Sequence, residues 1–212
     1  MFAKNRMLRS SFSRNHIEAG CDEAGRGCLA GPVVAAAVIL PRRYRHRELN
    51  DSKQLGREAR EALRIDIERD ALAWAVAEVD NDQIDRVNIL NASFEAMHKA
   101  IAKLSITPSL LLIDGNRFKP YPGIPYECVV KGDGKYLSIA AASILAKTYR
   151  DDLMNRMARE YPGYGWETNV GYPTLGHREG IRQLGISPLH RKSFALLPAQ
   201  LELFEDSVEV DN

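Results

Sequence analysis

Short apolar runs that alternate with helix-like stretches constrain the fold of this chain more than any other feature. Two apolar runs come first, at residues 17–21 and 33–40, and a glycine-rich turn joins them. Three more runs and three stretches of helical periodicity follow, in the order 57–70, 72–76, 82–103, 109–113, 126–130 and 138–161. Hairpin strands pair antiparallel, whereas strands separated by helices pair in parallel, so this order predicts an α/β domain with a mixed sheet.

Length and charge predict one globular domain with two charged ends. The 212 residues are 45% hydrophobic, which is enough for one sizeable core. We expect the domain at 16–198, a basic arm without fixed structure at 1–15 and an acidic tail at 199–212. The net charge of +1 argues against a histone-like binder of polyanions. Because no apolar run reaches the roughly 18 residues of a membrane span and no secretory signal is recognisable, we expect a cytoplasmic protein.

The three cysteines carry no recognisable metal or redox motif. Cys21, Cys28 and Cys128 form no Cys-x-x-Cys unit, so neither a zinc site nor a redox pair is indicated. We therefore expect free thiols that are mostly buried.

Acidic side chains follow three of the apolar runs. Asp22 and Glu23 end the first run, Asp114 follows 109–113, and Asp133 comes shortly after 126–130. In an open α/β sheet, groups at the ends of several strands can meet at one place. Clustered carboxylates repel one another unless cations neutralise them, and oxygen-only ligands favour Mg²⁺ or Mn²⁺. The alternative is that each acid simply begins a turn, where Asp is common, and the pattern alone leaves both interpretations open.

The turn at residues 25–30 fits the dinucleotide-binding pattern G-x-G-x-x-A, but its surroundings do not. Asp22 and Glu23 would repel a bound pyrophosphate, and an apolar strand follows where that motif requires a helix. Glycines also let a backbone approach a ligand closely, and backbone amides near a sugar could contact a 2′-hydroxyl. A turn whose backbone contacts a sugar is therefore favoured over a dinucleotide-binding loop.

Six ordered motifs resemble those of a known family. They are DEAGRG at 22–27, DSK at 51–53, LIDGN at 112–116, KGD at 131–133, AASILAK at 141–147 and GY at 171–172. Together they are similar to type 2 ribonuclease H, the bacterial ribonuclease HII, over about residues 17–194. The related ribonuclease HIII carries an additional N-terminal substrate-binding domain. Only the short arm at residues 1–15 precedes the expected domain here, so ribonuclease HII fits better. Cys28 and Pro173 depart from the proline and the glycine common at these positions.

The resemblance implies both a fold and an activity. The fold is ribonuclease H-like, a mixed β-sheet flanked by helices with a C-terminal helical extension. The activity is that of an endoribonuclease that hydrolyses the RNA strand of RNA–DNA hybrids. It also cuts on the 5′ side of single ribonucleotides embedded in duplex DNA, in ribonucleotide excision repair and primer removal, and leaves 3′-hydroxyl and 5′-phosphate ends. The implied catalytic residues, which would bind two ions of Mg²⁺ or Mn²⁺, are Asp22, Glu23, Asp114 and Asp133.

The resemblance also implies residues that contact the substrate. The backbone at residues 25–27 would contact the ribose 2′-hydroxyl, and Tyr172 would pack on the next deoxyribose. Ser143 and Lys147 lie one helical turn apart, so both can face one phosphate. The full set of expected substrate contacts is Gly25, Arg26, Gly27, Ser52, Lys53, Ser143, Lys147 and Tyr172. A core tyrosine and a solvated lysine are the alternatives for Tyr172 and Lys147.

The C-terminal tail contains a second candidate site. Gln200, Leu201, Leu203 and Phe204 form the sequence QLELF, which is similar to the QLxLF peptide with which bacterial replication and repair proteins bind the DNA sliding clamp. The alternative is that these apolar side chains pack on the domain. A peptide at a chain end can reach a partner's pocket at little structural cost, which favours clamp binding.

Three other functions compete with this interpretation. Metal-free attack by the 2′-hydroxyl would need histidines as acid and base, but His16, His46, His98, His177 and His190 are scattered along the chain. Another two-metal nuclease of this fold, such as a junction resolvase, would share the acids. A non-catalytic module that binds hybrids is disfavoured because acids facing phosphates weaken binding. We expect a monomer without membrane association.

Overall fold

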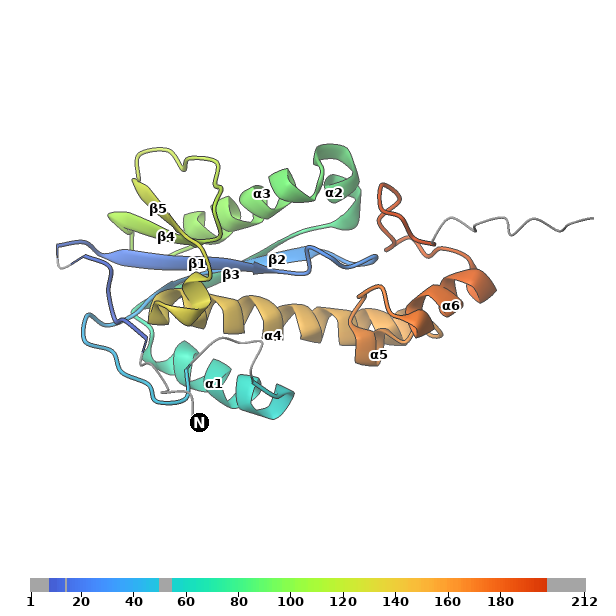
Figure 1. The fold of residues 1–212 in the computed structure, drawn as a ribbon, viewed down its shortest axis with the longest axis horizontal. Coiled ribbons are helices and arrows are strands. Elements are labelled where there is room, and N and C mark those ends of the chain that lie inside the picture. Colours follow the sequence, from blue (N-terminus) through green and yellow to red (C-terminus); the bar gives the residue numbers. More distant parts are fainter. Residues whose placement is uncertain (1–7, 14, 50–54, 198–212) are drawn as a thin grey trace, which may run out of the picture.

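The protein is a five-stranded mixed sheet with helices on both faces (Figure 1). The computed structural model describes residues 8–13, 15–49 and 55–197. The strand order is β3-β2-β1-β4-β5, in which β1, β2 and β3 pair antiparallel whereas β1, β4 and β5 pair in parallel. The strands are β1 Glu18–Ala24, β2 Val33–Ile39, β3 Ala73–Val79, β4 Leu110–Asp114 and β5 Tyr126–Val129. The predicted mixed α/β sheet is confirmed.

The helices form a layer on each face of the sheet. Figure 1 shows α2 and α3 on one side and α4 on the other with α1 outside it, while α5 lies against the last turns of α4 and α6 lies beyond them. Their bounds are α1 Arg57–Asp70, α2 Asn81–Val87, α3 Ile89–Ala102, α4 Leu137–Glu160, α5 Trp166–Asn169 and α6 Leu175–Leu184, with a short 3₁₀ helix, η2, at Gly132–Gly134. The last two helices form the expected C-terminal extension. None of the described helices is long and apolar enough to cross a membrane.

The single helix predicted at 82–103 is in fact two helices that meet at Asn88. Asn88 has φ of 67°, and its side-chain oxygen accepts hydrogen bonds from the Leu90 and Asn91 N–H groups at 3.1 Å. Asn tolerates this left-handed region and caps helices well, so one residue both ends α2 and begins α3.

The core lies on both faces of β2, which explains why its sequence is apolar without alternation. Every residue of β2 is buried. Ala35 and Ala37 face the cluster beneath α3, and Ala36 and Val38 face the cluster beneath α4. A strand buried on both faces has a continuous apolar sequence. All three cysteines are free, and Cys21 and Cys28 are buried, as predicted.

Part of the expected N-terminal arm lies against the domain. We expected residues 1–15 to lack fixed structure, but Arg9 pairs with Tyr136 in a parallel bridge. The composition of residues 1–15 as a whole, rich in Arg and Ser and free of acids, predicts an arm without fixed structure, because composition does not encode a contact with a residue more than a hundred positions away. The bounds of the arm, domain and tail otherwise stay predictions.

Gly20 allows β1 to lie directly on the first turns of α4. A Cβ atom at Gly20 would lie 2.2 Å from the Ser138 carbonyl carbon and 2.4 Å from the Ile139 nitrogen. Both atoms are backbone, so they cannot move aside as a side-chain end could. The spacing between sheet and helix therefore depends on this glycine.

Gly20→Ala is expected to lower the free energy of unfolding by about 2–3 kcal/mol or more, because it overpacks a rigid contact. Gly176→Ala is the matched control: Gly176 is exposed in α6 with no atom near its missing Cβ, and alanine there should be neutral or slightly stabilising. Urea unfolding of both variants checks the difference. Equal stability of the two variants would contradict the close-packing argument.

Candidate active site

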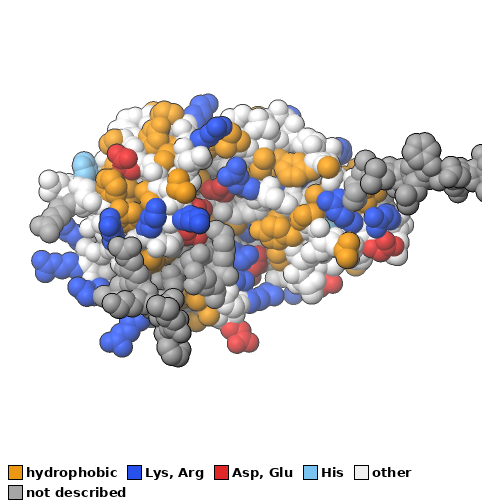
Figure 2. Space-filling model, viewed as in Figure 1, with side chains coloured by type: hydrophobic (Ala, Val, Ile, Leu, Met, Phe, Trp, Pro, Cys, Tyr) orange, Lys and Arg blue, Asp and Glu red, His pale blue; other side chains and the backbone are white. Residues whose placement is uncertain are grey.

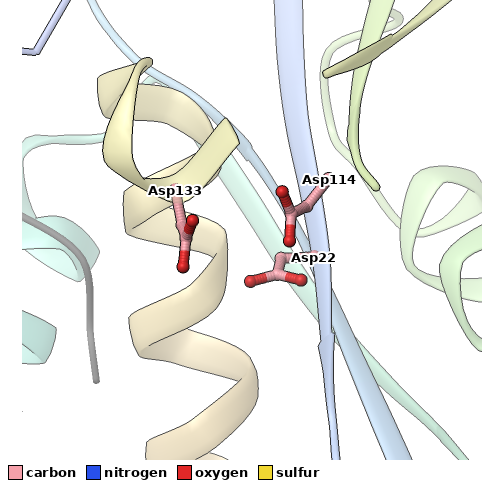
Figure 3. A group of neighbouring side chains, drawn as sticks. All are labelled: Asp22, Asp114 and Asp133. Atoms are coloured by element: carbon pink, nitrogen blue, oxygen red, sulfur yellow. The ribbon is translucent and has the colours of Figure 1, made fainter. Parts of the chain in front are cut away.

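Three aspartates from three separate elements meet at one edge of the sheet. Asp22 lies near the end of β1, Asp114 is the last residue of β4, and Asp133 lies in η2. One carboxylate oxygen from each lies within 4.8 Å of one from each of the others. Figure 3 shows the carboxylates of Asp22 and Asp114 pointing toward each other, with Asp133 facing them from the turn before α4. The predicted convergence of acids at strand ends is therefore present.

The strand register explains this convergence. Cys21 pairs with Ile113 in the parallel β1–β4 ladder, so the next residues, Asp22 and Asp114, lie side by side. After β5 the chain turns through Gly132, whose N–H donates a hydrogen bond to Asp114 Oδ1 at 2.6 Å. A Cβ on Gly132 would lie 2.6 Å from Ile139 Cδ1 in α4 and 3.3 Å from Asp114 Oδ1 and Val129 Cβ in the sheet, so glycine lets the turn pack closely between the helix and the sheet.

Burial and mutual repulsion make the ionised cluster costly without a cation. The pKa of Asp22 is raised well above its ordinary value, first because the carboxyl is buried and then because Glu23 and Asp114 lie near it. Hydrogen bonds from the Ser143 hydroxyl and the Glu23 N–H oppose the rise. A buried set of carboxylate oxygens without nitrogen or sulfur is a donor set that fits a hard divalent cation.

Glu23 lies in the same cleft but outside the group of three. Its Oε1 accepts a hydrogen bond from Arg26 Nη1 at 3.1 Å. Burial raises the pKa of Glu23, whereas the Arg26 charge opposes that rise. Its expected role as a metal ligand stays a prediction.

One cleft of about 260 Å³ contains the acids and most of the expected substrate contacts. Its lining residues are Asp22, Glu23, Ala24, Gly25, Arg26, Gly27, Asp114, Ser143, Lys147 and Tyr172. On the face viewed in Figure 2, acidic side chains lie in the middle of the molecule with Lys and Arg side chains around them. Asp133 completes the acidic cluster beside the cleft. The expected contacts Ser52 and Lys53, and the tail residues 200–204, lie outside the described residues.

Two buried arginines hold the glycine turn, and the sequence analysis missed both. Arg150 donates hydrogen bonds to the carbonyl oxygens of Pro32, Val170 and Ala30 at 3.0, 2.8 and 3.2 Å. A Cβ on Gly25 would lie 2.0 Å from Arg150 Nε, so the guanidinium packs directly under the turn.

Arg191 acts on the same turn. It donates to the carbonyl oxygens of Gly31 and Arg26 at 3.0 and 3.1 Å. The spacing of Arg150, three and seven residues after Lys147 and Ser143 on one helix, could have indicated its position. Arg191 has no comparable signal in the sequence.

The buried histidines are structural, which disfavours the metal-free mechanism. His177 Nδ1 lies 2.9 Å from the Tyr172 carbonyl oxygen, which can only accept, so Nδ1 carries the proton. His177 Nε2 therefore accepts, from Trp166 Nε1 at 2.9 Å and from His190 Nε2 at 3.2 Å. Burial lowers the pKa of His190 to about 4, so both rings are neutral near pH 7. No histidine lines the cleft.

Fold and site together define a class of protein. A mixed sheet with helices on both faces, and a carboxylate cluster where β1 and β4 run in parallel, are the features of the ribonuclease H-like nucleases, which hydrolyse phosphodiester bonds. Comparison with known proteins makes the assignment specific.

A model of the ribonuclease HII family matches residues 19–197. Ribonuclease HII of Parabacteroides distasonis is 64% identical over 197 residues, which cover 93% of this chain and 99% of that protein. The ribonuclease H2 structure from Pyrococcus horikoshii OT3 has a TM-score of 0.71 at 27% identity and covers 84% of this chain and 94% of its own. A PCNA–ribonuclease HII complex from Archaeoglobus fulgidus has a TM-score of 0.70 at 26% identity, covering 89% and 100%. This chain belongs to the ribonuclease HII family and is an endonuclease of the ribonuclease H2 type.

The acidic cluster predicts how a substitution changes stability. The raised pKa of Asp22 means that the fold is more stable with this carboxyl protonated and that this stability is lost as pH rises through the raised pKa, so negative charge on the cluster destabilises the fold when no divalent ion is bound. Asp22→Asn is expected to raise the melting temperature in EDTA and to reduce the increase that Mg²⁺ or Mn²⁺ gives the wild type. Thermal unfolding with EDTA or metal measures both effects.

Glu127→Gln is the control for this prediction, because Glu127 is an exposed acid outside the cleft. It should leave the melting temperature and its response to metal unchanged. An Asp22→Asn variant that melts lower in EDTA, or that keeps the full response to metal, would argue against the repulsive cluster.

Proposed function

We propose that this ribonuclease HII cuts duplex DNA on the 5′ side of a single embedded ribonucleotide, besides hydrolysing the RNA of RNA–DNA hybrids. The observation that carries the proposal is the cluster of three carboxylates, two of which, Asp22 and Asp114, line the same cleft as the turn at residues 25–27. Asp22, Asp114 and Asp133 would hold two ions of Mg²⁺ or Mn²⁺, with Glu23 as a further ligand. Divalent ions bound there would supply Lewis-acid stabilisation of the phosphoryl group under attack.

The residues of the cleft suggest a division of roles. The three aspartates would hold the divalent cations whose positive charge polarises the phosphate. Ser143 and Lys147 would bind the phosphate oxygens. Lys147 Nζ lies 3.9 Å from Asp151 Oδ1, and burial lowers the pKa of Lys147. Water attacks phosphorus, and the bond to the 3′ oxygen breaks on the opposite side. That oxygen leaves as a hydroxyl, and the phosphate stays on the 5′ end.

Selection of a ribonucleotide would depend on the backbone of the glycine turn. Gly25 has φ of 94°, and a Cβ atom at Gly27 would meet no atom within 4 Å, so the turn leaves room for a sugar to approach. Two buried guanidiniums support the turn: Arg150 packs against Gly25 and bonds the Ala30 carbonyl, and Arg191 bonds the Arg26 carbonyl. Tyr172, which lines the cleft and is 39% exposed, would pack on the following deoxyribose.

A duplex with one ribonucleotide, compared with the same duplex made entirely of DNA, tests the proposal. With Mg²⁺ or Mn²⁺, only the first should be cut, and EDTA should abolish cleavage. Asp114→Asn should lower the rate at least about a hundredfold, because several kcal/mol of charge stabilisation depend on the ion set. Glu127→Gln should cleave like the wild type.

Each other outcome points to a different function. Equal cutting of the all-DNA duplex would indicate a nuclease that does not read the 2′-hydroxyl. Cleavage that persists in EDTA would indicate attack without metal, and binding without cleavage would indicate a hybrid-binding module.

We infer that residues 200–204 bind a DNA sliding clamp, and that the tail at 199–212 is separate from the catalytic domain at 16–198. The peptide QLELF supports this, and a ribonuclease HII of the same fold has been solved as a complex with PCNA. Leu201, Leu203 and Phe204 would supply apolar anchors, and Gln200 a polar one.

Replacing Leu203 and Phe204 together by alanine is expected to abolish binding to a bacterial sliding clamp and to leave cleavage unchanged. Replacing Val208 and Val210 by alanine is the matched control, since both lie in the tail but outside the peptide. Surface plasmon resonance with immobilised clamp measures binding. A lowered melting temperature with unchanged clamp affinity would show that these side chains pack on the domain instead.

A further inference from the structure

Residues 8–13 contact the turn that carries Asp133. The Arg9 N–H donates to the Lys135 carbonyl at 2.8 Å, and the Arg9 carbonyl accepts from the Leu137 N–H at 3.0 Å. The Arg9 guanidinium lies 5.9 Å from the centre of the Tyr136 ring, and its Nη1 donates to the phenol oxygen at 3.3 Å. Arg9 therefore holds Tyr136 through both backbone and side chain.

The segment is itself fixed to the domain at its other residues. Leu8 packs against the core cluster between the sheet and α4. The N–H groups of Phe12 and Ser13 donate to the carboxylate of Glu18, the first residue of β1. Phe12 also lies with its ring centre 5.9 Å from that of Tyr136. The contacts of Leu8 with the core cluster and of the Phe12 and Ser13 N–H groups with Glu18 place Arg9 independently of the turn that it supports.

Tyr136 connects this segment to the acidic cluster. The N–H groups of Lys135 and Tyr136 both donate to the Gly132 carbonyl at 2.9 Å and close the turn. The Gly132 N–H reaches Asp114, and the Gly134 N–H donates to Asp133 Oδ1 at 3.0 Å. The turn at residues 131–136 therefore positions two of the three aspartates.

The turn needs support from outside because its backbone is strained. Lys131 has φ of 55°, in the left-handed region that costs a residue with a side chain about 1–2 kcal/mol. Such a conformation persists only where surrounding contacts fix it. The backbone pairing with Arg9 fixes the other end of the same turn, at Lys135 and Leu137.

We propose that residues 8–13 form a positioning strap for the metal centre, in which Arg9 acts through Tyr136 to keep Asp133 beside Asp22 and Asp114. This inference rests on the proposed role of those aspartates as metal ligands. Loosening the strap should weaken divalent-ion affinity more than it slows the chemical step, because groups behind metal ligands typically change affinity about 10–100-fold.

Two variants loosen the strap: deletion of residues 2–13 removes it, and Arg9→Pro removes the Arg9 N–H donor. Deletion of residues 2–7 keeps the strap and is the control. Mn²⁺ binding is titrated by electron paramagnetic resonance, and amide exchange is measured at residues 132–134. The first two variants should bind Mn²⁺ about tenfold more weakly and exchange faster. At saturating Mn²⁺ their cleavage rate should approach that of the wild type. The control should match the wild type throughout.

Unchanged Mn²⁺ affinity and amide exchange in Arg9→Pro would overturn the strap. If Arg9→Pro fails to fold, Arg9→Ala takes its place, because alanine keeps the backbone pairing and removes only the side-chain contacts. A loss of Mn²⁺ affinity in Arg9→Ala, smaller than the tenfold loss expected for Arg9→Pro, supports the strap. Wild-type affinity together with wild-type amide exchange contradicts it. A wild-type protein that binds no Mn²⁺ would instead overturn the proposed metal function. A wild type that binds Mn²⁺, with equal affinity in the variants, would overturn only the strap.

Discussion

The site depends on holding like charges together in a place from which water is partly excluded. Each aspartate of the cluster accepts at least one hydrogen bond from a fixed donor: Asp22 from the Glu23 N–H, Asp114 from the Gly132 N–H and Asp133 from the Gly134 N–H. Backbone donors cannot rotate away as side chains can. They offset part of the repulsion before any cation binds, so the cluster is largely preorganised and a cation need not assemble it.

The loop between β1 and β2, together with Val170 after α5, presents carbonyl oxygens that two buried guanidiniums bond. Arg150 and Arg191 together bond carbonyls at residues 26, 30, 31, 32 and 170. Arginine suits this task because its planar fork offers several donors in fixed directions and stays charged when buried. Loss of either side chain would leave buried carbonyls unpaired, and the turn at 25–27 would lose the support beneath it.

Local patterns predicted the parts of the molecule that local forces decide. The strands, α1 and α4 are visible as apolar periodicity, and the meeting of Asp22 with Asp114 follows once β1 and β4 are paired in parallel. Apolar periodicity does not predict three other features. They are the helix break at Asn88, the hydrogen bonds of Arg191 to the glycine turn, and the pairing of Arg9 with Tyr136. Each depends on a backbone conformation or a partner more than a hundred residues away, which periodicity does not encode.

Two structural units, the sheet with its acids and the C-terminal extension, meet beside the glycine turn. The acids belong to the sheet and η2, whereas Tyr172 belongs to the C-terminal extension. Residues 29–31 join the two units: the Leu29 N–H donates to the Gly171 carbonyl at 2.8 Å, the Arg191 N–H donates to the Leu29 carbonyl at 2.8 Å, and Ala30 bridges His190. The neutral His177 ring donates a hydrogen bond to the Tyr172 carbonyl, and the neutral His190 ring bonds His177 in turn. A change in the extension therefore reaches the glycine turn through residues 29–31. It reaches the aspartates through α4 as well, because Arg150 of this helix bonds the Val170 carbonyl and Ser143 of the same helix bonds Asp22.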